Sequence, residues 1–396
     1  MKITIVQGPY FPVPAINGGA IERVWFGLGK EFARRGHEVS HISRTDPRLP
    51  DREIIDGVQH VRIPSRDRLH NMVADNFFDL TYSLQVLPRL PKADILVTNT
   101  FWLPVLEKRA SRGRHYVHIA RFPRRQMRLY RHAARLQPVS NVIRDAIIDQ
   151  SPSLAPITRT IPNALPHDFK IATGVPAKNP DRFEIVFVGR LHPEKGIDIL
   201  LDAYHEFLVT ATRPVRLRIV GPHARNCGGG GEEYYRGLRE RAASLGASLE
   251  WCGPAFGAEQ LQRFYEEAHV LVYPSIAAKG EASPLTPVEA MASACVPVVS
   301  DLKCFADYLT DGVNGFTFSL TPSPSTNLAR VLTKASAPET SLVSIQQCCL
   351  KTAKEYSLSN VATLYEVDFL EILSSRENLA ADSRDLLASR PLHPKS

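Results

Sequence analysis

The stretch FEIVFVGRLHPEKGIDIL (residues 183–200) places an unbroken apolar run directly before a glycine, two cations and a second apolar segment. A run that is apolar at successive positions, rather than at every second one, is typical of a strand in a parallel sheet covered on both faces. The segment from Ile197 then has the pattern of a helix start. The stretch therefore predicts one strand–loop–helix unit of an α/β protein, with Arg190 and Lys195 in the loop at the carboxyl end of the strand.

The same alternation of strands and helices continues on both sides of this stretch. Further strands are predicted at 2–7, 37–43, 93–99, 114–120 and 135–140 before it, and at 215–221, 249–253, 269–275 and 296–300 after it. A helix is predicted from Ala20 to Arg35, and the polar residues 172–182 separate the two series. Because 396 residues exceed what one core usually supports, we predict two doubly wound parallel-sheet domains, with the default active site in the cleft between them.

Composition narrows the functional classes. A hydrophobic content of 44% and a charged content of 22% are ordinary for a soluble globular protein. No apolar run approaches the ~20 residues that span a bilayer, and the start lacks a cleavable signal pattern, so we expect a cytoplasmic protein. The six cysteines have no metal-ligand spacing and are expected to be reduced. Missing G-x-G-x-x-G, P-loop, H-E-x-x-H and G-x-S-x-G patterns argue against dinucleotide-dependent hydride transfer, P-loop hydrolysis, zinc proteolysis and triad hydrolysis.

Two loops carry candidate anion-binding groups. Gly18 and Gly19 follow the first strand and precede a helix, whose start offers free N–H groups and the positive end of its dipole. Arg190 and Lys195 can clamp a diphosphate, the first as a planar fork and the second as a point charge. A plain glycine-rich turn and solvated loop charges are the structural alternatives.

The segment GEASPLTPVEA (residues 280–290) places Glu281 in a loop and Glu289 in the first turn of the next helix. A carboxylate accepts hydrogen bonds from vicinal hydroxyls, and N–H groups near Leu285 and Thr286 can meet a phosphate between the two acids. The spacing suits a nucleotide-sugar. A helix-capping glutamate together with a solvent-facing one is the alternative.

A basic segment lies between these loops in the sequence. Residues 108–144 contain eleven Lys or Arg and no Asp or Glu, whereas the whole chain carries a net charge of +7. Within residues 121–136, Met127, Tyr130 and Ala134 recur at helical spacing, which predicts a basic helix. Three interpretations remain open: a solvated helix, a wall for an anionic or large acceptor, and contact with anionic lipid. Its candidate residues are Arg121, Arg124, Arg125 and Arg128.

Taken together, these motifs resemble the retaining glycosyltransferases of family GT4, which have the two-domain GT-B fold. The ordered agreement covers most of the chain and includes NGGAIERV, VFVGRLHPEKGIDILLDA, LRIVGP, YEEAHVLVYPS, EASPLTPVEAMASACVPVVS and DGVNGF. The resemblance implies transfer from a nucleotide-diphosphate sugar to a glycan, lipid-linked or natural-product acceptor, without a metal or other cofactor. It also implies an N-terminal acceptor domain (1–170), a C-terminal donor domain (171–357), a helix at about 358–374 that packs back on the N-terminal domain, and a polar tail (375–396).

The resemblance also assigns roles to single residues. Arg190 and Lys195 match the pair that neutralises the leaving diphosphate, Glu289 the acid that binds the ribose, and Glu281 the acid near the sugar's C3 hydroxyl. His118 matches a histidine near the C6 hydroxyl, although a strand-end histidine is otherwise more often a core residue. The implied catalytic residues are Arg190, Lys195, His118 and Glu281; the implied donor-binding residues are Gly18, Gly19, Gly189, Arg190, Lys195, Ser283, Leu285, Thr286 and Glu289.

The chain departs from the family pattern at Pro284, where a glycine is usual. Proline has no N–H, so one backbone donor toward the sugar is missing there. Rival interpretations are a phosphorylase or a nucleotide-sugar epimerase with the same fold, and a non-enzymatic adaptor that binds membranes or nucleic acid through the basic segment. No nucleic acid is expected as a partner, because an adaptor would not need Arg190, Lys195 and Glu289.

Overall fold

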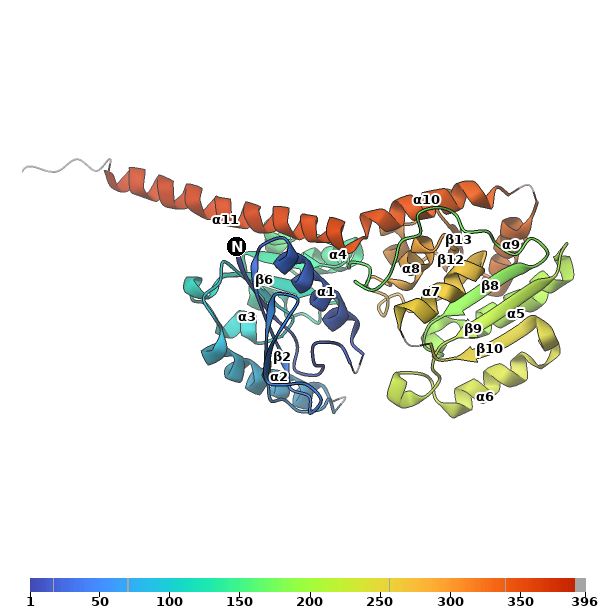
Figure 1. The fold of residues 1–396 in the computed structure, drawn as a ribbon, viewed down its shortest axis with the longest axis horizontal. Helices are drawn as coiled ribbons and strands as arrows, with labels where there is room; N and C mark the ends of the chain where they lie inside the picture. Colours follow the sequence, from blue (N-terminus) through green and yellow to red (C-terminus); the bar gives the residue numbers. More distant parts are fainter. Residues whose placement is uncertain (17, 70, 256, 339, 389–396) are drawn as a thin grey trace, which may run out of the picture. The chain divides into compact units, whose positions relative to one another are not determined.

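The computed structural model describes residues 1–388 except 17, 70, 256 and 339. The chain forms two compact units (Figure 1). Unit 1 comprises Met1–Val139, Ile143–Ile161 and the residues from Leu358 onward, and unit 2 comprises Ser140–Val142 and Pro162–Ser357. Each unit contains one sheet of mainly or entirely parallel strands, which confirms the predicted α/β class.

The sheet of unit 1 has the strand order β3-β4-β2-β1-β5-β6-β7. All neighbouring strands are parallel except β3 and β4, which form an antiparallel hairpin. The hairpin turns at Asp56 and Gly57, whose positive φ angles of 47° and 81° are those of a tight Asp-Gly turn. The strands are β1 (Lys2–Val6), β2 (Glu38–Arg44), β3 (Arg52–Ile55), β4 (Val58–Ile63), β5 (Ile95–Thr98), β6 (Arg114–Ile119) and β7 (Arg135–Pro138).

Helices flank this sheet. The first, α1 (Ala20–Arg34), packs on the C-terminal helix α11 (Leu358–Ala388), so the end of the chain belongs to unit 1. Where a polar tail was predicted after residue 374, α11 continues to Ala388, and residues 389–396 lie outside the described residues. The other helices of unit 1 are α2 (Met72–Val86), α3 (Leu103–Leu106) and α4 (Asn141–Gln150), with 3₁₀ turns η1 (Leu87–Arg89), η2 (Ala110–Arg112), η3 (Met127–Tyr130) and η4 (Pro152–Ile157).

The prediction of a basic helix over residues 121–136 is wrong. Only the single 3₁₀ turn η3 forms there, and β7 begins at Arg135. Pro123 lacks an N–H, and Arg125 has a φ of 66°, which is outside the right-handed helical region. Met127 and Tyr130 are buried as the helical spacing implied, but through one 3₁₀ turn.

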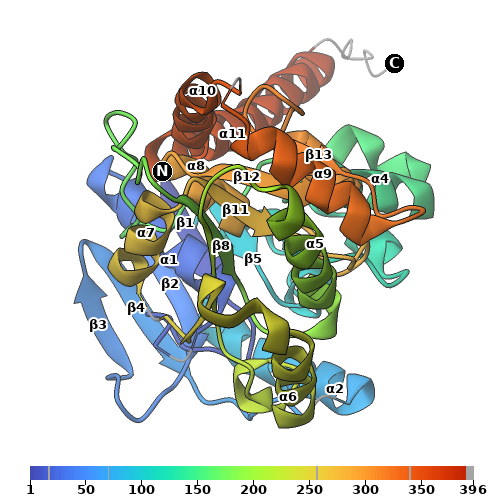
Figure 2. The ribbon, with the colours of Figure 1, turned by 90° about the vertical axis from the view of Figure 1, so that its right-hand side faces the viewer.

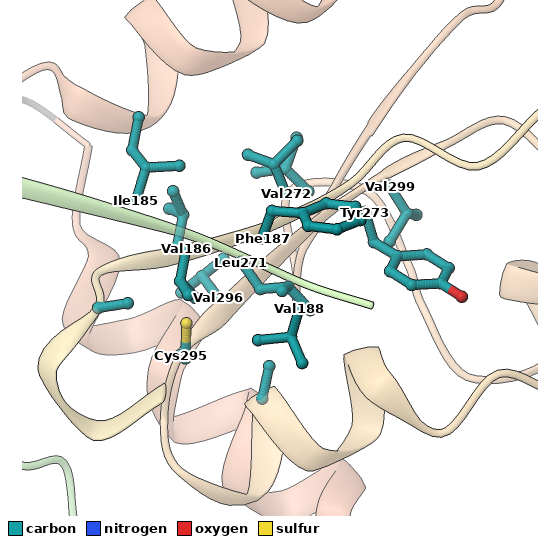
Figure 3. Packing of buried hydrophobic residues seen from close by; sticks show 14 of the residues in the cluster. Ile185, Val186, Phe187, Val188, Leu271, Val272, Tyr273, Cys295, Val296 and Val299 are labelled. Atoms are coloured by element: carbon teal, nitrogen blue, oxygen red, sulfur yellow. The ribbon is translucent and has the colours of Figure 1, made fainter. Parts of the chain in front are cut away.

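The sheet of unit 2 is entirely parallel, in the order β10-β9-β8-β11-β12-β13. Its strands are β8 (Phe183–Val188), β9 (Val215–Val220), β10 (Leu249–Gly253), β11 (Val270–Tyr273), β12 (Val296–Ser300) and β13 (Phe316–Phe318). Every residue of β8 is buried, which explains its continuous apolar run. Figure 3 shows apolar side chains of β8, β11 and β12 packed together in this core.

The helices of unit 2 lie on both faces of its sheet. Helix α5 packs with α9, whereas α8 packs with α7 and α10 (Figure 2). Their bounds are α5 (Ile197–Thr210), α6 (Glu232–Arg241), α7 (Ala258–Glu267), α8 (Thr286–Ala292), α9 (Pro324–Ser336) and α10 (Leu342–Glu355), with 3₁₀ turns η5 (Pro193–Lys195), η6 (Arg225–Cys227), η7 (Ala243–Ser248) and η8 (Lys303–Asp307). The strand order reverses between β8 and β11, and the carboxyl ends of strands at such a reversal are the usual ligand site.

Candidate functional site

The loop after β8 lies against the end of β11. Ile185 of β8 is opposite Val270 of β11, so the carboxyl ends of these two parallel strands meet at the same edge of the sheet. Gly196 follows Lys195 with a φ of 64°, and a Cβ there would lie 2.2 Å from the carbonyl oxygen of Pro274. Glycine at this position therefore lets the loop that carries Lys195 approach the backbone after β11.

Lys195 takes part in a buried polar cluster. Its Nζ donates to the hydroxyl of Tyr273 at 2.6 Å and forms an ion pair with Oε1 of Glu281. The same carboxylate oxygen accepts from Tyr273 at 3.0 Å and from Oγ of Ser275 at 2.8 Å. Lys195 is 9% exposed and Glu281 5% exposed, so the pair is shielded from water. Burial, and secondarily the charge of Glu281, raise the pKa of Tyr273 well above its ordinary value, which keeps this hydroxyl protonated.

The sequence did not single out Tyr273 and Ser275. The signal that could have found them is their spacing, because residues two apart at the end of a strand point to the same side. Their hydroxyls give Glu281 two hydrogen bonds in addition to the ion pair, as a buried carboxylate requires.

Arg190 lies in the same loop as Lys195 but has different partners. Its Nη1 donates to the carbonyl oxygen of Gly228 at 2.7 Å, and its Nη2 donates to Oε1 of Glu194 at 2.7 Å. The side chain is 45% exposed. The glycine-rich residues 227–231 therefore lie beside Arg190, and Gly230 N–H donates to the carbonyl oxygen of Leu191 at 2.7 Å.

Gly189 joins two loops at the carboxyl edge. Its N–H donates to the carbonyl oxygen of Val220 at 3.0 Å. A Cβ on Gly221 would lie 1.8 Å from the carbonyl oxygen of Gly189, so the loops after β8 and β9 touch backbone to backbone. This contact fixes the direction in which the Arg190 loop leaves the strand.

The second acid, Glu289, is on α8 and is also buried. It is 9% exposed, and the hydroxyl of Tyr265 donates to its Oε2 at 3.3 Å. Ser283, Leu285 and Thr286 are half-buried residues at the start of α8, where the first N–H groups of a helix lack intrahelical acceptors. Glu281 and Glu289 thus have separate partners.

His118 lies in unit 1 on β6 and is 7% exposed. Its Nδ1 is 2.6 Å from Oε1 of Gln137, which also accepts from the hydroxyl of Tyr365 at 2.8 Å. Because Nε2 of Gln137 donates to the carbonyl oxygen of Ile161 at 2.7 Å, the amide oxygen must face His118, and Nδ1 of His118 must carry the proton.

His118 Nε2 is therefore an acceptor, and it has no hydrogen-bond partner among the described residues. Burial lowers the pKa of His118 to about 4, so the ring is neutral at pH 7. A buried, unprotonated nitrogen of this kind can accept a hydrogen bond from a ligand hydroxyl.

Gly18 and Gly19 precede α1, as predicted. Gly19 has a φ of 105°, and a Cβ there would lie 2.4 Å from Oε2 of Glu22. Glu22 is 8% exposed, and burial raises its pKa to about 7. This carboxyl was not predicted; its position in the first turn of α1, after Ile21 and two residues before Val24, is the signal that could have found it.

The four candidate arginines of the basic segment, Arg121, Arg124, Arg125 and Arg128, are all exposed. The charge of Arg121 acts on Glu22 and opposes the rise of its pKa. These arginines thus lie in unit 1 with His118 and Gly19, whereas Arg190, Lys195, Glu281 and Glu289 lie in unit 2.

No group of three or more His, Cys, Asp or Glu side chains that could hold a metal ion occurs within the part of the chain that the structure describes. A separate search of the same residues finds no helix long and apolar enough to cross a membrane.

The buried cluster lies in a segment that matches a protein-family model. Residues 168–339 match the model of "Glycosyl transferases group 1". The chain is 28% identical over 228 residues to spore coat protein SA of Bacillus subtilis (strain 168), covering 52% of this chain and 58% of that protein. It spans about half the length of the curated relatives it matches.

Solved structures resemble nearly the whole chain. Sucrose-phosphate synthase (tll1590) from Thermosynechococcus elongatus has a TM-score of 0.75 at 16% identity, covering 95% of this chain and 100% of that one. Alr3699/HepE of Anabaena in complex with UDP-glucose has a TM-score of 0.68 at 18% identity, with coverage of 95% and 100%. The predicted GT-B fold class, with two Rossmann-like domains, is confirmed.

Proposed function

We propose that this protein transfers a sugar from a nucleotide-diphosphate sugar to an acceptor hydroxyl, with retention of anomeric configuration and without a metal ion. The observation that carries the proposal is the buried cluster of Lys195, Glu281 and Tyr273 beside Arg190. It lies at the reversal point of the unit 2 sheet, inside the segment that matches Glycosyl transferases group 1. The solved complex of the Anabaena protein with UDP-glucose supports a nucleotide-sugar as the donor class.

In this proposal the donor lies along the carboxyl edge of β8 and β11. Arg190 and Lys195 bind the diphosphate, and the first N–H groups of α8 at Leu285 and Thr286 contribute further donors. Glu289, oriented by the hydroxyl of Tyr265, binds the ribose hydroxyls. Glu281 binds hydroxyls of the transferred sugar through Oε2, because its Oε1 already accepts from Tyr273 and Ser275.

The reaction breaks the bond between the anomeric carbon and the leaving phosphate oxygen, and negative charge grows on the diphosphate. The cations at Arg190 and Lys195 stabilise that charge. The acceptor oxygen forms its bond on the same face that the diphosphate leaves, and its proton passes to the departing phosphate oxygen. His118 accepts a hydrogen bond from a hydroxyl of the sugar through its unpartnered Nε2.

The acceptor is a glycan, a lipid-linked molecule or a natural product that binds unit 1. The exposed arginines Arg121, Arg124, Arg125 and Arg128 suit an anionic group on such an acceptor. Gly18 and Gly19 give the loop beside them the freedom to approach the substrate closely.

Pro284 is proposed to influence which sugar is used. Its carbonyl oxygen accepts from the hydroxyl of Tyr308 at 3.3 Å, so the loop has an acceptor at this point but no backbone donor. An unpaired hydroxyl acceptor in a closed site costs about 1–3 kcal/mol, which favours a donor whose sugar lacks or inverts a hydroxyl there.

The first experiment is a thermal-shift panel of UDP-, GDP-, ADP- and dTDP-sugars. A donor at about 100 times its Kd should stabilise the protein by about 2.7 kcal/mol. The donor that binds is then incubated with candidate acceptors and the products are analysed. Free nucleotide diphosphate together with a new glycoside of retained configuration supports transfer. A sugar phosphate or an epimerised donor would instead identify the phosphorylase or the epimerase.

The Arg190→Ala variant tests the diphosphate clamp. Because Arg190 is half exposed, its loss should hardly affect folding, but kcat should fall by more than about threefold. Arg236→Ala is the matched control, since Arg236 is an exposed arginine of unit 2 that also pairs with a glutamate four residues later. If both variants keep the wild-type kcat, the assignment of Arg190 is wrong.

A further inference from the structure

Helix α2 of unit 1 exposes several large apolar side chains and buries Asp79. Met72, Val73, Phe77 and Leu84 are 60%, 75%, 58% and 51% exposed. Asp79, by contrast, is 7% exposed and accepts hydrogen bonds from the backbone N–H groups at the start of α3. This is the reverse of a solvated surface helix, whose charged residues face water. The outer face of α2 therefore has the composition of a surface that contacts an apolar partner.

The apolar side chains continue onto neighbouring segments. Helix α3 contacts both α2 and η3, and Nε1 of Trp102 donates to the carbonyl oxygen of Asn76 at 3.1 Å. Of the sixteen large hydrophobic side chains exposed among the described residues, seven belong to this surface. We call them the α2 surface: Leu69, Met72, Val73, Phe77, Leu84, Leu106 and Leu129.

Arginines border the α2 surface. Arg66 and Arg68 are exposed just before α2, and the Arg66 guanidinium lies 5.6 Å from the ring centre of Phe78. Arg128 is exposed in η3, next to Leu129, and Arg124 and Arg125 are exposed just before η3. Residues 108–144 contain no acid, so no carboxylate of that segment neutralises Arg124, Arg125 and Arg128. Arg68, by contrast, pairs with Asp75 at 3.1 Å, and the exposed Asp67 lies between Arg66 and Arg68.

We propose that the α2 surface lies on an anionic lipid membrane, with its apolar side chains at the boundary of the acyl chains and its arginines at the lipid phosphates. The charge complementarity argues for lipid as the occupant, because the five bordering arginines outnumber Asp67 and Asp75, and an excess of positive charge suits a uniformly anionic plane. The basic segment provides only the charged edge of the surface, and α2 provides the apolar centre. Contact of the α2 surface with lipid does not require the transfer reaction.

The test measures partition of the full-length protein onto vesicles. Phosphatidylcholine vesicles are compared with vesicles that also contain phosphatidylglycerol, at low and high salt. Binding is expected only with the anionic lipid and should weaken as salt screens the arginines. Phe77→Ser should lower the partition coefficient about tenfold, and Arg124→Gln together with Arg128→Gln should lower it by roughly twentyfold. Val209→Ser is the matched control, since Val209 is 82% exposed on α5 in unit 2.

Trp102 reports whether this surface is the one that meets the lipid. Brominated lipids should quench its fluorescence on binding, and Trp102→Phe should abolish that quenching, because Trp25 is fully buried and Trp251 belongs to unit 2. Absence of binding to anionic vesicles, or equal binding by wild type and Phe77→Ser, overturns the proposal. A soluble dimer that Phe77→Ser converts to monomer would also overturn it, since a second copy would then cover the surface.

Discussion

Replacing Lys195 by Met should destabilise unit 2 far more than a loop substitution normally does. The Lys195 ammonium and the Glu281 carboxylate form an ion pair in which the two side chains are 11% and 6% exposed. Removing one partner of a buried pair leaves an uncompensated charge and costs about 3–5 kcal/mol. Tyr273 and Ser275 still donate to Glu281 in this variant, so we expect the lower end, about 3 kcal/mol.

A double-mutant cycle isolates the pair itself. Glu281→Gln alone should also cost about 3 kcal/mol, because it leaves the ammonium beside a neutral amide. The double variant should cost about 3 kcal/mol rather than about 6, since neither charge then remains buried. The expected coupling energy is therefore about 3 kcal/mol, at the upper end of what contacting residues show.

The assay must report on unit 2 alone, because a chain of two units need not unfold in one step. Hydrogen exchange of peptides from β8 and β11, followed as a function of urea, gives the free energy of opening this sheet. Additive effects within about 0.5 kcal/mol would refute the buried pair. Arg190→Ala in the same assay should lose less than about 1 kcal/mol, because the ion pair of Arg190 with Glu194 is partly exposed to water.

Three further predictions concern unit 1. Burial raises the folded-state pKa of Glu22 from 4.5 to about 7, so its stabilising contribution is complete below pH 4.5 and is lost as the pH rises to 7. Glu22→Gln should therefore be about 3 kcal/mol more stable than wild type in urea at pH 8 and close to it in stability at pH 4. Burial lowers the pKa of His60 from 6.5 to about 4, so the stabilising contribution of the neutral ring is complete above pH 6.5 and is lost as the pH falls toward 4. The free energy of unfolding of wild type relative to His60→Phe should therefore fall by about 2 kcal/mol from pH 7 to pH 5. A difference that stays constant over this range would contradict the prediction. Asp368 is fully buried, accepts a hydrogen bond from the Tyr116 hydroxyl at 2.7 Å and forms an ion pair with Arg135 at 2.7 Å. Asp368→Asn should therefore lower the Tm measured by calorimetry by roughly 6–12 °C. A shift below about 2 °C would count against the role of α11 in unit 1.

The sequence predicted the long strands because burial on both faces leaves a pattern that local reasoning can detect. Each strand predicted from an apolar run is present, with its ends displaced by no more than two residues. The hairpin β3–β4 was missed because its exposed and buried residues alternate and it is antiparallel at a sheet edge, although Asp56-Gly57 carried a turn signal. The prediction of a helix over residues 121–136 was wrong because it used only the spacing of the apolar residues. It left out the backbone limits at Pro123 and Arg125.

For the candidate site, the sequence identified residues but not their partners. The loops that carry Arg190, Lys195 and Glu281 could be placed at strand ends, since parallel strands all end at one edge. The direct contact between Lys195 and Glu281 could not be predicted, because it depends on how two loops separated by 86 residues fold onto each other. The orientation of the His118 ring likewise depends on the Gln137 amide oxygen, which also accepts from Tyr365. Tyr365 lies near Gln137 only because α11 packs back on unit 1.

The ion pairs of Arg190 and Lys195 determine how the proposed diphosphate clamp must operate. Both of its cations already have a carboxylate partner, Glu194 for Arg190 and Glu281 for Lys195. A donor diphosphate must therefore compete with these carboxylates, and it competes better as its negative charge grows. In the ground state the cations are shared, whereas in the transition state the leaving phosphate carries the larger charge and attracts them more strongly. Such differential binding lowers the barrier without tightening the ground-state complex, which is what catalysis by a charge clamp requires.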